Sequence, residues 1–297
     1  MSVSFIKKKN PYPHWEYKNP AFDSLIRIVP ERGGLITEWR SEGKELLYFD
    51  LDRFLDKDKS VRGGIPILFP ICGDLSEGYS SGCKMYFLKQ HGFARDLPWS
   101  INLLKDKLGI RLKLTDTKDS RSYFPFFFTL WMDVRLKEKS LQISIKIHNQ
   151  SQDSMPFSFG LHPYFQVSNT QKIKIDGLPE KCIDQTNMKV TNVSDQIRIL
   201  DKGVDFLSYP SSSVKMFDFL SRNVIELIHQ EPMDTTVIWT DPPRQMVCLE
   251  PWTSPRNSLV TGDRKLEIKP EEYIDLSTTF QHNSFLIYTS SASDERS

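Results

Sequence analysis

The sequence predicts an all-β protein, a large β-sandwich of mainly antiparallel strands with few short helices. Apolar and polar residues alternate with a period of two along many segments, which is typical of half-buried strands. No long segment follows the helical period of about 3.6 residues. The 18 prolines and 14 glycines are spread between the alternating segments. Turns rather than crossover helices are therefore expected to connect the strands.

The most regular alternation predicts a β-hairpin. Leucine, methionine and valine occupy every second position of residues 130–136. The sequence Lys-Glu-Lys-Ser at 137–140 then predicts a turn, and leucine and isoleucine occupy every second position of 141–147. Residues 110–114 alternate in the same way and predict another half-buried strand.

Other segments carry shorter strand and helix signals. The strongest apolar run, 124–132, contains Pro125 and is about half as long as a membrane span, so it predicts a buried strand. Residues 51–59 are the best helical candidate. Further strands are predicted at 25–29, 35–39, 46–49, 172–175, 197–200, 224–229, 236–240, 245–250, 265–268 and 273–280.

The length and composition favour a single domain in the cytoplasm. Sandwiches and barrels often reach 297 residues as one unit, and no linker divides this chain. We expect one domain over residues 1–297, with its core between about 25 and 280. The four cysteines form no C-x-x-C pair, and no apolar segment follows Lys7, Lys8 and Lys9, so reduced thiols and no export are expected.

The charge balance excludes some classes of partner. The chain has 39 Lys and Arg residues against 38 Asp and Glu residues, a formal net charge of +1. No global field then favours nucleic acid or an anionic membrane. A small molecule is the expected partner.

A histidine in an unusual setting is the most informative local feature. Residues 160–165 read Gly-Leu-His-Pro-Tyr-Phe, so His162 lies between a flexible glycine and a rigid proline with aromatic residues beside it. Proline disfavours helix for the residue before it, which places His162 on an extended or turning segment. With an unperturbed pKa of roughly 6.5, this imidazole can give and take protons near neutral pH.

Three other segments carry candidate site residues. Arg62 precedes paired glycines, which let the backbone approach a ligand or adopt a positive φ. His91 and Arg95 lie within five residues of each other and are bracketed by aromatic residues. Glu250 ends a strand that Pro251 stops. If this carboxylate faces a partly dry pocket, its proton affinity rises and it becomes a useful base.

Together these motifs resemble a known family. Segments 61–70, 90–99, 160–165 and 247–252, in this order and at this spacing, are similar to those of the aldose 1-epimerase (mutarotase) superfamily. The resemblance covers about residues 25–280 and implies the galactose mutarotase-like β-supersandwich fold.

The resemblance also implies a role for each candidate residue. His162 would be the general acid on the ring oxygen of the sugar, and Glu250 would remove the proton from the anomeric hydroxyl. His91, Arg62 and Arg95 would bind the substrate. Asp205 would correspond to an acidic residue that binds sugar hydroxyls.

The reaction that this family catalyses needs no cofactor and no metal. Interconversion of α and β anomers requires one proton removed from O1 and one added to the ring oxygen, with a base and an acid on opposite sides. The chain has no H-E-x-x-H, no phosphate-binding G-x-x-x-x-G-K-[ST] and no G-x-S-x-G. The expected partner is a hexose or a hexose phosphate.

The sequence leaves the substrate and two rival functions open. The motifs around Arg62 and Arg95 resemble those of hexose-6-phosphate 1-epimerases, whereas residues 162–165 are closer to galactose-type mutarotases. A broad aldose 1-epimerase is the first hypothesis and a glucose-6-phosphate 1-epimerase the alternative. A non-catalytic sugar-binding protein would use aromatic platforms, and a glycosidase would need two carboxylates about 5–5.5 Å apart for retention. The aromatic candidates for the former are Phe93, Trp99 and Trp252, and the carboxylate candidates for the latter are Glu250 and Asp205.

Overall fold

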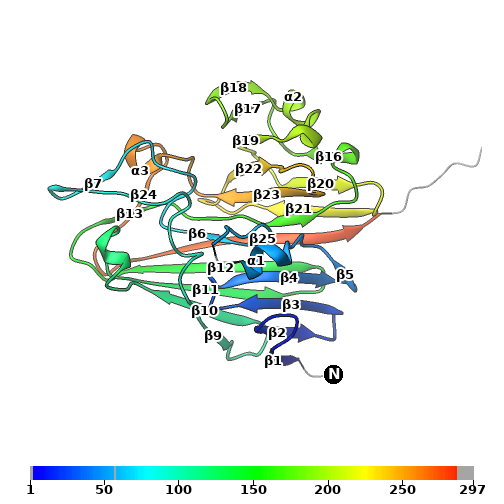
Figure 1. The fold of residues 1–297 in the computed structure, drawn as a ribbon, viewed down its shortest axis with the longest axis horizontal. Coiled ribbons are helices and arrows are strands. Elements are labelled where there is room, and N and C mark those ends of the chain that lie inside the picture. The colour runs from blue at the N-terminus through cyan, green and yellow to red at the C-terminus, as the bar shows by residue number, and fades with distance from the viewer. Residues whose placement is uncertain (1–2, 57, 286–297) are drawn as a thin grey trace, which may run out of the picture.

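The computed structural model describes residues 3–56 and 58–285. Most of this chain forms antiparallel strands, and two eight-stranded sheets dominate (Figure 1). The first sheet has the order β16 (Ile173–Asp176), β20 (Val214–Asp218), β21 (Asn223–Ile228), β25 (Tyr273–Ser284), β12 (Ser140–Asn149), β11 (Phe128–Leu136), β10 (Ile110–Thr115) and β9 (Ser100–Leu103). The second has the order β18 (Lys189–Asn192), β17 (Lys181–Asp184), β19 (Asp205–Ser208), β22 (Thr235–Trp239), β23 (Met246–Trp252), β14 (Gly160–Leu161) and β6 (Ile67–Leu68), with β15 (Tyr164–Gln166) also paired to β23.

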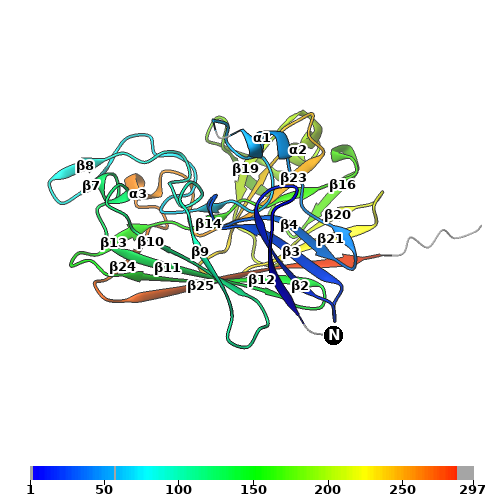
Figure 2. The same cartoon turned by 60° about the horizontal axis from the view of Figure 1, so that its bottom comes forward.

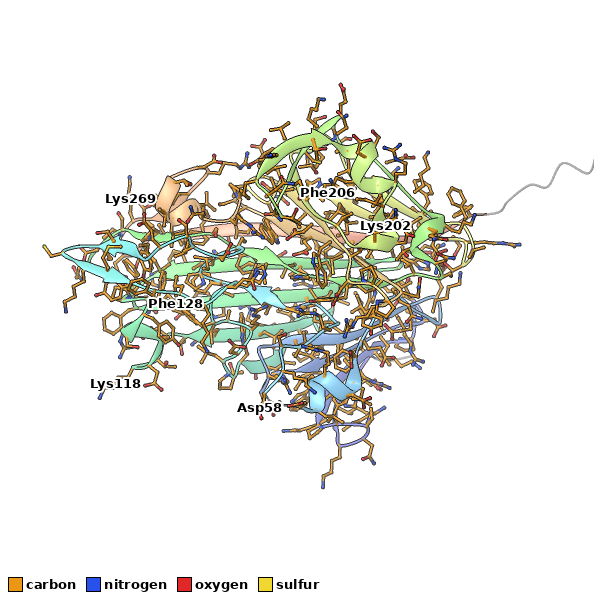
Figure 3. The ribbon with its side chains drawn as sticks, turned by 45° about the horizontal axis from the view of Figure 1, so that its top comes forward. Asp58, Lys118, Phe128, Lys202, Phe206 and Lys269 are labelled. Carbon is orange, nitrogen blue, oxygen red and sulfur yellow. The ribbon has the colours of Figure 1, made fainter. Side chains whose placement is uncertain are left out.

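The two large sheets enclose the main hydrophobic core. Figure 2 shows β10, β11, β12 and β25 in one layer, with β14, β19 and β23 above them. Phe165 and Phe280 contact across the layers, with their ring centroids 5.5 Å apart. Phe128 and Phe206, labelled in Figure 3, are fully buried, whereas the labelled Lys202 lies exposed at the periphery. The predicted all-β sandwich with few short helices is confirmed.

Smaller sheets complete the fold. A five-stranded antiparallel sheet, blue in Figure 1, contains β1 (Ser4–Lys8), β2 (His14–Asn19), β3 (Ser24–Val29), β4 (Leu35–Ser41) and β5 (Lys44–Glu45). Two-stranded pairs are formed by β13 (Met155–Phe157) with β24 (Leu266–Ile268), and by β7 (Tyr79–Ser81) with β8 (Lys84–Tyr86). Strands β1 and β2 lie before residue 25, and the fully buried Tyr17 of β2 belongs to the main core.

The predicted hairpin is confirmed by its register. Leu130 pairs with Ile147 and Leu136 with Leu141 across β11 and β12. Lys137 N donates to Ser140 O at 2.9 Å and closes the predicted turn. The alternating residues of both strands face the core because the side-chain period of a strand is two.

The helical segment predicted at 51–59 is shorter than expected. Helix α1 spans Leu51–Leu55, and the side chain of Asp50 accepts a hydrogen bond from Arg53 N at its start. Arg32 donates to the carbonyl oxygens of Phe54 and Asp56. These contacts satisfy acceptors at the end of the helix that have no partner within it.

The strand predicted at 197–200 is wrong. Helix α2 spans Val193–Ile197 and a 3-10 turn follows at Leu200–Lys202. Val193, Ile197 and Leu200 are spaced four and three residues apart, which places them on one helical face rather than one strand face. The remaining helical segments are α3 (Ser258–Thr261) and 3-10 turns at Ser120–Ser122 and Thr170–Lys172.

Two further strand predictions are wrong over part or all of their length. The apolar run at 124–132 becomes a strand only at Phe128, because Pro125 has no N–H for a ladder and Phe124 and Phe126 pack into the core as a loop. Residues 46–49 form only isolated bridges. Leu46 N donates to Trp39 O, whereas Phe49 bridges to Gly63. None of the helices in the described residues has the length and hydropathy of a membrane span.

Candidate active site

Strand β23 has one face in the main core and the other in the candidate site. Val247 and Leu249 belong to the main core cluster. Their neighbours Cys248 and Trp252 belong to two small separate clusters, and Glu250 lies between them. The alternation of a strand therefore places Glu250 outside the main core although only 1% of its surface is exposed.

The register of the second sheet extends this face into a row of side chains. Cys248 pairs with Tyr164 on one side and with Trp239 on the other. Trp239 pairs with Asp205, whose carbonyl oxygen accepts from Gln185 N at 2.8 Å. Paired residues of neighbouring strands project to the same side. Four residues from four strands, Tyr164, Cys248, Trp239 and Asp205, thus share the face that carries Glu250.

His162 and Glu250, predicted from motifs far apart in the sequence, lie in contact. His162 Nε2 is 3.4 Å from Glu250 Oε1, and the second oxygen of Glu250 accepts from Trp252 Nε1 at 3.1 Å. His162 N donates to Pro66 O, and its ring stacks on Tyr164 with 4.7 Å between centroids. Both side chains of the pair therefore have fixed positions.

Burial displaces the proton affinities of this pair in opposite directions. Burial, followed by the negative charge of Asp205, raises the pKa of Glu250 well above its usual range. Burial, followed by the positive charges of Arg95 and Arg62, lowers the pKa of His162 to about 3. Both shifts favour the uncharged forms. Because the groups touch, their titrations are coupled.

His91 lies beside this pair in a strained conformation. Its φ of 65° is in the left-handed region, which few residues with a side chain adopt. Its Nδ1 accepts from Gly73 N at 3.1 Å, so the proton of the neutral ring is on Nε2. Burial, then the charges around it, lowers the pKa of His91 well below its usual value. The rings of His91 and His162 have centroids 5.7 Å apart.

The two predicted arginines flank the same region. Arg62 contacts Asp241 Oδ2 at 3.4 Å and lies over the Trp239 ring at 5.4 Å from its centroid. The glycines after it have the predicted positive φ, 133° and 68°. Arg95 is half-buried and donates to Gln90 O at 2.8 Å, and no carboxylate in the described residues forms an ion pair with it.

The predicted Asp205 is held by two residues that the sequence analysis missed. Gln185 Nε2 donates to Asp205 Oδ1 at 2.7 Å, and Arg256 Nη2 donates to Oδ2 at 3.3 Å. Burial raises the pKa of Asp205, whereas the charge of Arg256 opposes that rise. No local motif marks Gln185 or Arg256, because their contacts depend on the pairing of β17 with β19 and on the chain after β23.

The aromatic residues proposed as sugar platforms are buried instead. Phe93 and Trp99 are 5% and 4% exposed and belong to the main core cluster. Trp252 is 2% exposed, and its indole N–H donates to Glu250. None of the three offers a free ring face to a sugar. Trp239 has its ring beside the pair, and its centroid is 5.7 Å from that of His162. No motif in the sequence marks this residue.

Three potential metal ligands also converge in the described residues. One ligand atom from each of His162, Cys248 and Glu250 lies within 4.8 Å of the others. A thiol binds a metal as thiolate, and burial raises the pKa of Cys248 well above its usual value. The positive charges of Arg62, Arg95 and Arg256 also act on these groups. The positive charges and the protonated thiol oppose the binding of a cation.

Comparison with known proteins identifies the family. The sequence matches aldose 1-epimerase over residues 24–281 of 297. The chain belongs to the aldose 1-epimerase family. The predicted galactose mutarotase-like fold is confirmed by comparison with the structure of a galactose mutarotase-like protein from Clostridium acetobutylicum. The two structures superpose with a TM-score of 0.80 at 16% sequence identity. The match covers 96% of this chain and 99% of that one.

Two other proteins are more similar in sequence to this chain than the Clostridium protein is. The structure of the Slr1438 protein from Synechocystis sp. PCC 6803 is 33% identical, with a TM-score of 0.88, and the match covers 96% of this chain and 100% of that one. A protein of Cenchrus ciliaris named "Putative glucose-6-phosphate 1-epimerase" is 28% identical over 232 residues. That match covers 74% of this chain and 65% of the relative, slightly under two thirds of its length.

Proposed function

We propose that this protein interconverts the α and β anomers of a hexose by general acid–base ring opening and closing. Glu250 takes the proton of the anomeric hydroxyl, and His162 gives a proton to the ring oxygen. The observation that carries the proposal is the 3.4 Å contact between His162 Nε2 and Glu250 Oε1 in a nearly dry site. Each positioned group of this kind accelerates proton transfer by about 10²–10⁴-fold.

The adjacency of the two groups is compatible with the reaction, although the sequence predicts an acid and a base on opposite sides. The anomeric hydroxyl oxygen and the ring oxygen are bonded to the same carbon, C1. An acid and a base can therefore serve both oxygens from neighbouring positions. Glu250 on β23 and His162 between β14 and β15 occupy such positions.

The proton balance of the step matches the environment of the pair. The reactive form of the pair has a proton on His162 and an ionised Glu250, which burial makes the less stable of the two arrangements. As the C1–ring oxygen bond breaks, Glu250 gains the proton of O1 and His162 loses its own to the ring oxygen, which leaves an aldehyde and an uncharged pair. Burial favours this uncharged pair, so it stabilises the state reached after ring opening. Rotation about the C1–C2 bond and the reverse transfers produce the other anomer.

The arginines favour a phosphorylated hexose over a neutral one. Arg95 is half-buried, has no ion pair in the described residues, and acts with Arg62 on the pKa of His162. Arginine forks match the geometry of phosphate oxygens. The name of the Cenchrus ciliaris relative agrees with this substrate class. A neutral aldose remains the second candidate, since residues 162–165 resemble galactose-type mutarotases.

The other functions considered from the sequence have less support. A retaining or inverting glycosidase needs a second carboxylate free to act on the glycosidic bond. The described partners of Asp205 include an ion pair with Arg256 and a hydrogen bond from Gln185, which suit a binding role better. A sugar-binding protein without activity would need the aromatic platforms that are buried here.

A substrate panel tests the function and the substrate class together. Freshly dissolved α-anomers of glucose, galactose and glucose 6-phosphate are followed by polarimetry and by exchange NMR with catalytic amounts of protein. We expect acceleration for all substrates that bind and the highest kcat/KM for glucose 6-phosphate. No acceleration of any of the three would overturn the proposed function.

Arginine variants then test the phosphate assignment. Arg62→Ala and Arg95→Ala are expected to lower kcat/KM for glucose 6-phosphate by about tenfold or more, because hydrogen bonds to charged groups are lost. The loss for glucose should be smaller. Arg111→Ala, which breaks an exposed ion pair with Asp133, is the matched control. Equal losses for glucose and glucose 6-phosphate would mean that the arginines do not form a phosphate site.

A further inference from the structure

Arg256 joins three segments of the chain beside the candidate active site. It lies between β23 and α3 and is half-buried. Its Nε donates to Gln185 Oε1 at 3.1 Å and its Nη1 to Gln185 O at 3.3 Å. Its Nη2 contacts Asp205 Oδ2 at 3.3 Å, and Asp74 Oδ1 is 3.6 Å from Nε. One guanidinium thus fixes residues that are far apart in the sequence.

Gln185 closes this arrangement into a triangle. Its amide nitrogen donates to Asp205 Oδ1 at 2.7 Å while its amide oxygen accepts from Arg256. Each of the three side chains therefore contacts the other two, and the amide can have only one orientation. Each oxygen of Asp205 has one such contact, and a carboxylate has about four acceptor positions. Acceptor capacity is left for the hydroxyl groups of a sugar.

The backbone of Arg256 also packs against the residue that orients His91. A Cβ atom on Gly73 would lie 2.4 Å from Cβ of Arg256, so only glycine fits there. Gly73 N donates to Nδ1 of His91, and Gly73 O accepts from His91 N. Arg256 therefore packs against the residue whose N–H fixes the tautomer of His91, and it also contacts Asp205.

Arg256 and Asp205 exert opposite electrostatic effects on Glu250. The charge of Asp205 raises the pKa of Glu250, and the charge of Arg256 lowers it. Loss of Arg256 would leave the effect of Asp205 on Glu250 without this opposing charge. The titratable and charged groups that act on Glu250 or contact it in the described residues are His162, Tyr164, Cys72, Cys248, Asp205, Arg95 and Arg256.

We propose that Arg256 is a positioning residue of the epimerase, which holds the carboxylate of Asp205 and the amide of Gln185 as one rigid unit for binding sugar hydroxyls. The inference rests on the proposed function, because the unit lies in the row of side chains next to Glu250. A rigid set of buried polar groups discriminates between sugars by the hydroxyls that leave those groups unpaired. Arg256 therefore contributes to the choice among hexoses that differ at one hydroxyl.

The test measures KM and kcat separately for Arg256→Gln and Arg256→Lys, using whichever of the three hexoses the wild type converts fastest. We expect Arg256→Gln to raise KM by about tenfold, because charged hydrogen bonds to the binding unit are lost. It should also narrow the difference in kcat/KM between glucose and galactose. The pH profile of kcat/KM should move to higher pH, because the pKa of Glu250 rises when a positive charge is removed. Arg256→Lys should restore the pH profile but not KM, since it keeps the charge and loses the fork.

A double-mutant cycle separates positioning from a general structural effect. If Arg256 acts through Asp205, the KM of Arg256→Gln combined with Asp205→Asn should equal that of Asp205→Asn alone. Independent, multiplied effects would overturn the inference. Arg264→Gln is the matched control, because Arg264 contacts Thr253 O and Asp234 instead of the binding unit. Its KM and pH profile should be those of the wild type.

The outcomes also separate this inference from the proposed function. A wild-type protein without activity overturns the proposed function and with it the inference. An active wild type together with an Arg256→Gln variant of unchanged KM and pH profile overturns the inference alone. Should Arg256→Gln fail to fold, Arg256→Lys provides the test. A wild-type pH profile with a raised KM supports the inference, and an unchanged KM overturns it.

Discussion

Two histidine–glutamate pairs in different sheets have nearly the same geometry. His162 Nε2 is 3.4 Å from Glu250 Oε1, and His148 Nε2 is 3.5 Å from Glu271 Oε2. Each histidine also stacks on a tyrosine with an interplanar angle of 10°. The side chains differ in exposure, at 10% and 1% for the first pair and 11% and 67% for the second.

The two pairs differ in the burial of the carboxylate and not in distance, and burial is the property on which the proposed reactivity of the first pair depends. Burial raises the pKa of Glu250 and lowers that of His162 to about 3, so the uncharged form of each group is favoured. Water screens the charge of Glu271, which is exposed at the turn before β25. Under the proposed function the first pair exchanges its proton with a bound substrate, whereas Glu271 of the second pair is exposed to water.

The largest expected effect comes from removing one group of each pair in turn. Glu250→Gln and His162→Gln should each lower kcat/KM by about 10²–10⁴-fold, because general acid–base catalysis is lost. Glu271→Gln and His148→Gln should leave it unchanged. Exchange NMR on glucose 6-phosphate measures all four. Near-wild-type activity in either variant of the first pair would remove that residue from the mechanism.

A smaller effect is expected from the tryptophan that supports Glu250. Trp252→Phe removes the indole N–H that donates to Glu250 Oε2 and keeps most of the buried volume. We expect kcat to fall by about tenfold, because a hydrogen bond to a charged carboxylate stabilises the base and orients it. Trp131→Phe, on the sheet that carries His148, is the control. An unchanged kcat in Trp252→Phe would mean that other contacts are sufficient to orient Glu250.

The buried carboxylate should also cost stability, in a way that depends on pH. The folded protein raises the pKa of Glu250, so the stabilisation from its protonated form is present below the unfolded pKa of about 4.3 and is lost as the pH rises through the folded value. Glu250→Gln avoids this loss. Its unfolding free energy should exceed that of the wild type by ~1 kcal/mol at alkaline pH and by less at acidic pH. Denaturant melts of Glu250→Gln and Glu271→Gln across pH measure the difference, and equal curves for both variants would contradict it.

Local patterns were sufficient to predict most strands and to mark the two residues that we propose as the catalytic pair. The register of β11 and β12 follows from residues that alternate along each strand. His162 and Glu250 are marked by the proline and aromatic residues directly beside them in the sequence. The strand prediction at 197–200 is wrong because the few apolar residues there fit the strand period of two as well as the helical period of about 3.6. Only the packing of the segment as the end of a helix decides between the two.

The remaining site residues depend on contacts between distant segments. Trp239 reaches the site because β22 pairs with β23, and Gln185 because β17 pairs with β19. Arg256 is placed by the chain that leaves β23. Strand register and loop path are set by the packing of the whole sheet rather than by local composition. Phe93 and Trp99 show the reverse error, since aromatic residues in a site motif proved to fill the core.

The smallest expected effect concerns the thiol of Cys248, which lies beside His162 and Glu250. Cys248 lies within 4.8 Å of His162 and Glu250, and burial keeps it protonated by raising its pKa. Cys248→Ala should therefore change kcat/KM by less than about threefold, a shift well under the 1.4 kcal/mol that corresponds to tenfold. Cys182→Ala, which removes a buried thiol from β17, controls for the lost volume. If Cys248→Ala lost as much activity as Glu250→Gln, acid–base catalysis by His162 and Glu250 alone would be an incomplete mechanism, and a thiolate or a cation held by it would be required.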